Sequence, residues 1–142
     1  MIENSENTKI FRDYFGRNKK IENLTENGVL SCAFFVSSIL YLFGLIQNIH
    51  LSVKGAVKDM KKSGWFEISK PKRGSVLLWE KKDEHYHLGF YLGNQKAISN
   101  NFKKKMPIIH HFTYKRKRKI EAIFWHKKLS GSKTLSKVVQ EP

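Results

Sequence analysis

Apolar residues follow two patterns along this chain, with helix-like spacing before residue 64 and short strand-like runs after it. A nearly continuous apolar run covers residues 33–46, and Ser31 just before it is a typical helix N-cap. We therefore expect a buried helix that carries Cys32 in its first turn. A second amphipathic helix is expected from about Val53 to Lys62, because its four apolar residues share one face, and Gly64 ends it.

The second half of the chain is typical of strands. Short runs of β-branched, aromatic and leucine residues alternate with turns such as Gly93-Asn94. Helices that precede antiparallel strands indicate the α+β class, with the helices packed on an antiparallel sheet of about five strands. The expected strands are Ser75–Glu80, His87–Leu92, Lys96–Asn100, Ile108–Tyr114 and Ile120–Trp125.

The two ends of the chain are less apolar. One short amphipathic helix is expected around residues 8–15, and residues 127–142 are rich in Ser and Lys, which predicts a loosely attached tail. Since 142 residues suit one ordinary domain, we expect a single domain over residues 1–126.

Composition narrows the function classes. The net charge is +15, from 27 Lys and Arg against 12 Asp and Glu, so anionic partners are plausible. One cysteine excludes an internal disulfide framework and a Cys-rich zinc site. The first 20 residues show no apolar segment of the kind found in secretory signals, and the run at 33–46 is shorter than the roughly 20 residues of a membrane span.

Cys32 is the first candidate for chemistry. Free N–H groups at a helix N-terminus favour thiolate over thiol, so this position predicts a lowered cysteine pKa and a nucleophile. Taken alone, a single Cys beside Ala33 and Phe34 is more often a small core residue. Titration of the thiol would separate the two interpretations.

A thiolate nucleophile needs a base, normally a histidine, and a residue that orients the base. His87 opens an apolar strand, and the next strand along the chain ends in the polar residues Ser99, Asn100 and Asn101. The order of Cys, then His, then a polar residue is the order found in one large class of cysteine peptidases.

Three segments carry a resemblance to the NlpC/P60 peptidases over roughly residues 27–101. Ser31-Cys32-Ala33-Phe34-Phe35-Val36 resembles the Asp-Cys-Ser-Gly-Phe-Val segment at the family's nucleophile. The segment from Pro71 to Trp79 resembles the family's Pro-Gly-Asp-Leu-Val-Phe-Trp strand. His87-Leu88-Gly89-Phe90-Tyr91-Leu92-Gly93-Asn94 is similar to the strand that carries the catalytic histidine. The related CHAP amidases share this layout.

The resemblance implies a papain-like core and hydrolysis of peptide or amide bonds in bacterial cell-wall peptidoglycan, without a cofactor. It implies Cys32 as nucleophile and His87 as base. The family's third histidine aligns near Ser99, where this chain has none, and CHAP-type members use Glu, Asp or Asn. Asn100 is therefore the expected third catalytic residue, with Ser99 and Asn101 as alternatives.

The other histidines are not expected to take part in catalysis or to bind a metal ion. His110 and His111 are neighbours on a strand, so they point to opposite faces and cannot both bind one metal ion; both are expected to be surface or cleft residues. No Asp, Glu or Cys completes a metal site with His85 and His87. His50 and His126 are expected at the surface.

Five consecutive basic residues, Lys115, Arg116, Lys117, Arg118 and Lys119, are expected at a solvated hairpin tip. They could contact an anionic polymer or nucleic acid by electrostatic attraction. Two alternatives to an enzyme follow, a catalytically silent binding module of the same fold and a nucleic-acid-binding protein of unrelated fold.

Overall fold

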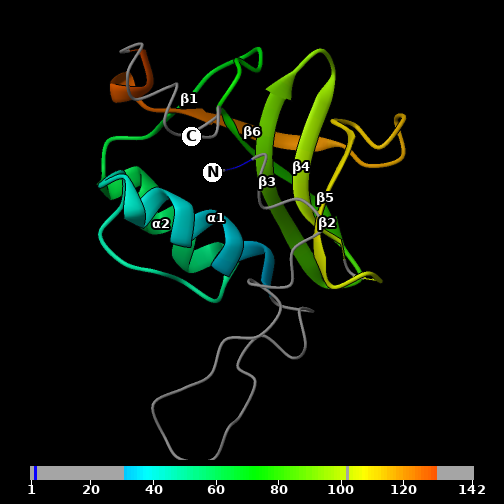
Figure 1. Ribbon diagram of the computed structural model, residues 1–142, viewed down its shortest axis with the longest axis horizontal. Helices are drawn as coiled ribbons and strands as arrows, with labels where there is room; N and C mark the ends of the chain where they lie inside the picture. Colours follow the sequence, from blue (N-terminus) through cyan, green and yellow to red (C-terminus); the bar gives the residue numbers. More distant parts are fainter. Residues whose placement is uncertain (1, 3–30, 102, 131–142) are drawn as a thin grey trace, which may run out of the picture.

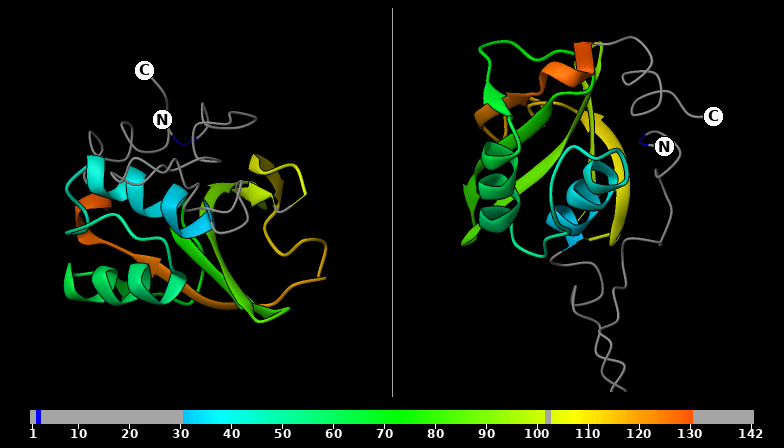
Figure 2. Two further views of the ribbon diagram at one scale, coloured as in Figure 1. Left: turned by 90° about the horizontal axis from the view of Figure 1, so that it is seen from below. Right: turned by 90° about the vertical axis from the view of Figure 1, so that its left-hand side faces the viewer.

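The computed structural model describes residues 2, 31–101 and 103–130 (Figure 1). The helix expected around residues 8–15 and the end of the expected tail lie outside the described residues. Both expected helices within the described part are present. They lie side by side on the same side of the sheet, which curves around α1 (Figures 1 and 2).

The first helix, α1, spans Ser31–Leu42 and is shorter than the apolar run that predicts it. It ends because Gly44 adopts a left-handed conformation with a φ of 68°, after which the Leu45 N–H donates to the Leu40 carbonyl at 2.9 Å. Leu45 and Ile46 stay buried beyond the helix end, so the apolar run continues in the core although the helix does not.

The second helix, α2, spans Val53–Lys62, with Ser52 as its N-cap and the Ser52 hydroxyl accepting from the Gly55 N–H at 3.0 Å. The loop between the helices is held by Asp59 of α2. The Asp59 carboxylate accepts two backbone N–H groups of this loop and lies 2.7 Å from the His50 ring. His50, expected at the surface, is partly exposed and lies against this carboxylate.

Six antiparallel strands form one sheet in the order β1-β6-β2-β3-β4-β5. Five of them match the expected strands within a few residues, while β1 is a two-residue strand that the sequence did not indicate. The strands are β1 (Phe66–Glu67), β2 (Val76–Lys82), β3 (His85–Gly93), β4 (Lys96–Asn101), β5 (Met106–His111) and β6 (Ile120–Trp125). Two helices over an antiparallel sheet confirm the α+β class.

The sheet order changes the expectation for the basic segment 115–119. The strand β5 lies at one edge of the sheet, whereas β6 pairs with β1 and β2. Residues 112–119 therefore do not form a hairpin tip but a crossover loop between non-adjacent strands. Three successive residues of this loop, Tyr114, Lys115 and Arg116, have left-handed φ angles of 52°, 56° and 67°.

The two faces of the sheet are both apolar but differ in what covers them. One face carries Leu88, Phe90 and Ile98, which pack against the helices, and the Phe35 ring of α1 meets the Phe90 ring edge-on at 5.7 Å. The other face carries Leu77, Trp79 and Ala97, and the crossover loop packs against it. Alternation along each strand therefore separates a helix-covered face from a loop-covered face.

The folded chain continues past the expected domain end. Residues Lys127–Ser130 form a short 3₁₀ helix, η2, whose Leu129 is buried in the core. His126, expected at the surface, is also buried, and its ring lies against Trp65 with a centroid distance of 5.5 Å. In the ranges that the structure describes, no helix is long and apolar enough to cross a membrane.

Candidate active site

Cys32 lies in the first turn of α1, as the sequence predicts, with part of its surface accessible. Its sulfur accepts a hydrogen bond from the backbone N–H of Leu88 in β3. Because Leu88 directly follows His87, this bond places the thiol beside the peptide unit that joins the two residues. The structure thus brings together the expected nucleophile and the strand that carries the expected base.

The sheet leaves room for the thiol at this point. The Tyr91 N–H and carbonyl both bond toward the start of β2, so by alternation the Leu88 N–H points to the β4 side of β3. The last residue pair between β3 and β4 is Gly89↔Ser99, so Leu88 lies just beyond the paired region. A backbone donor that the sheet does not use is therefore available to Cys32.

The charge state of Cys32 differs from the expectation. Burial raises the pKa of the Cys32 thiol, and this effect exceeds that of the surrounding backbone N–H groups and the Arg118 charge, which lower it. The expectation of a lowered thiol pKa is therefore wrong, because desolvation opposes the helix terminus. In the resting protein Cys32 is a neutral thiol.

His87 lies on the loop-covered face, directly opposite Trp79 of β2. Its ring contacts the Trp79 ring at a centroid distance of 5.3 Å and the Tyr114 ring at 6.4 Å. Burial, with added repulsion from Arg118 and His110, lowers the pKa of His87 to about 3. The imidazole is therefore neutral at physiological pH and able to accept a proton.

Asn100, the expected third residue, lies on the other face of the sheet. Its neighbour Ser99 pairs with Gly89 and thus shares the face of His87, while alternation places the buried Asn100 side chain on the helix-covered face. The assignment of Asn100 as the residue that orients the His87 ring is therefore corrected. Asn101 returns to the loop-covered face, and its side-chain oxygen accepts the Lys104 N–H at 2.7 Å.

Ser99 instead belongs to a polar group formed with the next strand and the crossover loop. Its hydroxyl lies 2.7 Å from Nε2 of His110 and 3.0 Å from the phenol oxygen of Tyr114. The His110 and Tyr114 rings stack, with a centroid distance of 4.1 Å and an angle of 16°. His110, expected as a surface or cleft residue, therefore lies in this polar group.

Gly89 makes this arrangement possible. A Cβ atom on Gly89 would lie 2.7 Å from the Ser99 Cβ and 2.9 Å from the Trp79 ring. Only a glycine therefore lets the Trp79 indole and Ser99 approach the β3 backbone beside His87.

Arg118 is the charged group of the site. Its guanidinium donates to the Glu80 carbonyl at 3.0 Å and to the His85 carbonyl at 3.0 Å, which fixes it over the β2–β3 hairpin. Its positive charge lowers the pKa of Cys32 and that of His87. The other four basic residues of the segment, Lys115, Arg116, Lys117 and Lys119, are exposed.

The sequence did not indicate Trp79 and Tyr114 as active-site residues, and it indicated His110 only as a surface or cleft residue and Arg118 only as part of the basic segment. Their only sequence signal is weak, an aromatic or basic residue within an ordinary strand or loop. They meet because the crossover loop returns over the sheet, which no local pattern reveals.

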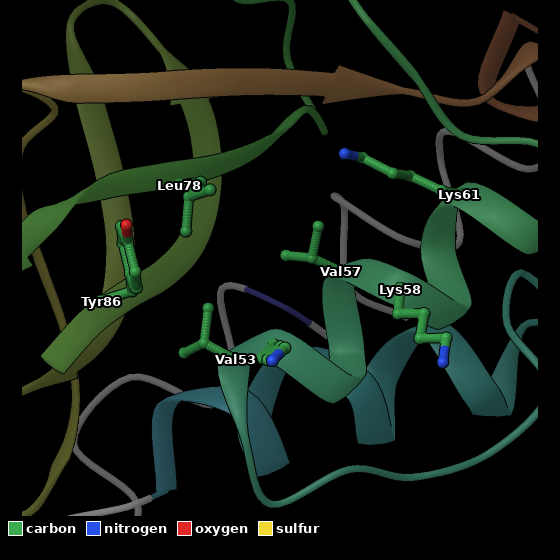
Figure 3. Close-up of a pocket in the computed structure, with 7 residues that line it drawn as sticks. Val53, Val57, Lys58, Lys61, Leu78 and Tyr86 are labelled. Atoms are coloured by element: carbon green, nitrogen blue, oxygen red, sulfur yellow. The ribbon is translucent and has the colours of Figure 1, made fainter.

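A separate apolar groove of about 440 Å³ lies between α2 and the β2–β3 hairpin (Figure 3). Val53 and Val57 of α2 face Leu78 and Tyr86 across it. The groove includes neither Cys32 nor His87, so the candidate site does not depend on it. Within the described residues, no group of three or more His, Cys, Asp or Glu side chains could hold a metal ion.

Comparison with known proteins identifies the family of the chain. Residues 25–132 match the NlpC/P60 family, whose members are generally hydrolases of the cysteine peptidase and amidase type. No curated protein matches the sequence. The matched segment contains Cys32, His87 and the whole sheet. Because the match covers most of the chain, the protein belongs to the NlpC/P60 family.

Proposed function

We propose that this protein hydrolyses peptide or amide bonds in bacterial cell-wall peptidoglycan, with Cys32 as nucleophile and His87 as base. The observation that supports the proposal is the hydrogen bond from the Leu88 N–H to the Cys32 sulfur, because the thiol then lies beside the peptide unit that joins His87 and Leu88. Membership of a family of cell-wall peptidases and amidases supports the substrate class.

At the start of the proposed reaction both the Cys32 thiol and the His87 ring are neutral. Neutral His87 removes the proton of the Cys32 thiol as the sulfur attacks the carbonyl carbon of the scissile bond. The carbonyl oxygen becomes an oxyanion, and the N–H of Cys32 at the N-terminus of α1 and the Arg118 guanidinium are the positive groups near it. The protonated His87 then gives its proton to the leaving amine, which leaves a thioester on Cys32.

Hydrolysis of the thioester repeats the same proton transfers with water. His87 removes a proton from the water as its oxygen attacks the thioester carbonyl, and the thiolate leaves and is reprotonated. The burial that holds both groups neutral in the resting protein also strengthens the attraction between thiolate and imidazolium once they form.

Release of soluble fragments from purified peptidoglycan sacculi tests the proposal. We expect fragments from the native protein and none from the Cys32→Ser variant, which keeps the side-chain shape. Mass spectrometry of the fragments identifies the cleaved bond. Equal release by Cys32→Ser would exclude Cys32 as the nucleophile.

We further propose that the exposed cations of the crossover loop bring the protein to its anionic substrate. Four of these cations are exposed to solvent, namely Lys115, Arg116, Lys117 and Lys119. Their positive charges attract polyanions, and the proposed chemical step does not use them. Replacing these four by Gln, with Arg118 retained, is expected to weaken binding to sacculi and reduce its dependence on salt. Turnover of a short soluble peptide is expected to stay unchanged. Salt-sensitive binding to DNA without binding to sacculi would instead favour a nucleic-acid partner.

A catalytically silent binding module is the second candidate function. The raised pKa of the Cys32 thiol favours it, because a neutral thiol is a weak nucleophile unless His87 takes its proton. The same experiment separates the two functions. Binding to sacculi without release of fragments would support the binding module.

A further inference from the structure

The His87 ring packs against two other aromatic rings. Its centroid lies 5.3 Å from that of the Trp79 ring and 6.4 Å from that of the Tyr114 ring. Trp79 and Tyr114 also contact each other edge-on at 5.4 Å. The position of Tyr114 therefore helps to decide the position of the imidazole.

The phenol of Tyr114 belongs to a chain of hydrogen bonds in which each donor and acceptor is fixed by the chemistry of the groups. Nδ1 of His110 lies 2.8 Å from the His111 carbonyl oxygen, which can only accept, so Nδ1 carries the proton. The burial that lowers the pKa of His110 keeps its ring neutral, so Nε2 must accept. The Ser99 hydroxyl therefore donates to Nε2 and accepts from the phenol of Tyr114.

The chain of bonds runs in one direction, from Tyr114 to Ser99, then His110, then the His111 carbonyl. Packing holds these side chains in position, because Ser99 is only 1 % exposed and the Tyr114 and His110 rings stack with a centroid distance of 4.1 Å. The left-handed φ of 52° at Tyr114 also needs such support, since a bulky residue rarely adopts it.

We propose that Ser99 and His110 are positioning residues of the catalytic histidine, which they orient through Tyr114. Hydrogen bonds hold the Tyr114 ring in place, and Tyr114 with Trp79 then holds the His87 ring on the loop-covered face. This chain thereby replaces a single polar third residue by an aromatic clamp with its own hydrogen-bonded support. The inference rests on the proposed catalytic pair of Cys32 and His87.

The rate of Cys32 alkylation by iodoacetamide tests the inference without a substrate. Since the chain has one cysteine, the rate reports Cys32 alone. The Ser99→Ala and Tyr114→Phe variants both remove the hydrogen bond between Ser99 and Tyr114, Ser99→Ala also removes the one between Ser99 and His110, and neither variant adds atoms. We expect each to lower the rate about tenfold at neutral pH, because a misplaced base assists proton removal less. The double variant should lose about the same tenfold, because both changes break one chain.

Controls separate positioning from folding and from failure of the proposed function. Tyr86→Phe changes an exposed tyrosine next to His87 and is expected to keep the native rate. Thermal unfolding shows which variants are folded at the assay temperature. Native rates in the folded Ser99→Ala and Tyr114→Phe variants, or additive losses in the double variant, would overturn the inference. A native rate in His87→Gln would instead show that no catalytic pair exists.

Discussion

The neutral, half-buried His87 predicts that acid destabilises the fold. The pKa of His87 is lowered to about 3 by burial, with Arg118 and His110 adding repulsion, whereas an unfolded histidine titrates near 6.5. Between these two values the unfolded chain binds a proton that the folded chain does not bind. The free energy of unfolding therefore falls as the pH falls, by about 1.4 kcal/mol per pH unit within this window. From pH 7 to pH 4 the loss from His87 alone is about 3 kcal/mol.

Denaturant unfolding of the native protein and of His87→Gln at pH 7 and pH 4 measures this loss. The native protein should lose about 3 kcal/mol more than the variant, because glutamine does not titrate. His85→Gln is the matched control, since His85 is exposed on the same strand and should lose as much as the native protein. Equal losses in the native protein and His87→Gln would refute the reasoning, as would an NMR titration of the His87 ring with a pKa near 6.5.

Three further variants test other contacts of the structure. Asp59→Asn should lower the free energy of unfolding by about 2 kcal/mol, measured at pH 7, because an amide cannot accept all the hydrogen bonds of the carboxylate. Gly89→Ala should cost about 1–3 kcal/mol in the same measurement and slow Cys32 alkylation, because the new methyl group meets the Trp79 ring. Arg118→Gln should raise the pKa of Cys32 further, seen as a shift of the alkylation rate to higher pH.

Each variant has an outcome that would contradict its premise. Asp59→Asn with native stability would mean that the loop does not depend on the carboxylate. Burial raises the pKa of Asp59, but the stronger hydrogen bonds lower it below 3.8, so its contribution should persist down to that pH and be lost below it. Native stability of Gly89→Ala would show that the strands move enough to accommodate the new methyl group, so that glycine is not required there. Arg116→Gln is the control for Arg118→Gln, and an equal shift in both would assign the effect to net charge.

The sequence by itself determined the fold class and most of the strands, and it indicated the two residues of the proposed catalytic pair. These depend on local patterns, which are the period of apolar residues, capping residues and turns, and on motifs that span a few positions around Cys32 and His87. The end of α1 shows the limit of such patterns, because the apolar run continues to Ile46 while Gly44 ends the helix. An apolar run records burial and not helix length.

Only the tertiary structure decided the surroundings of the pair. Which side chain lies beside the His87 ring depends on strand register, and a shift of one residue moves a side chain to the other face. Register places Ser99 on the same face of the sheet as His87 and Asn100 on the other face. His110, Tyr114 and Arg118 reach the site through the crossover between β5 and β6, a long-range connection with no local signal.

The charge states of the pair were also decided by tertiary structure. Local sequence placed the Cys32 thiol at a helix terminus, which favours thiolate, but burial by the surrounding chain raises its pKa. The effect of desolvation on the pKa depends on every group that excludes water from the site, whereas the effect of the helix terminus depends on one helical turn. A motif thus determines which atoms can react, and the packed fold determines the protonation state of these atoms in the resting protein.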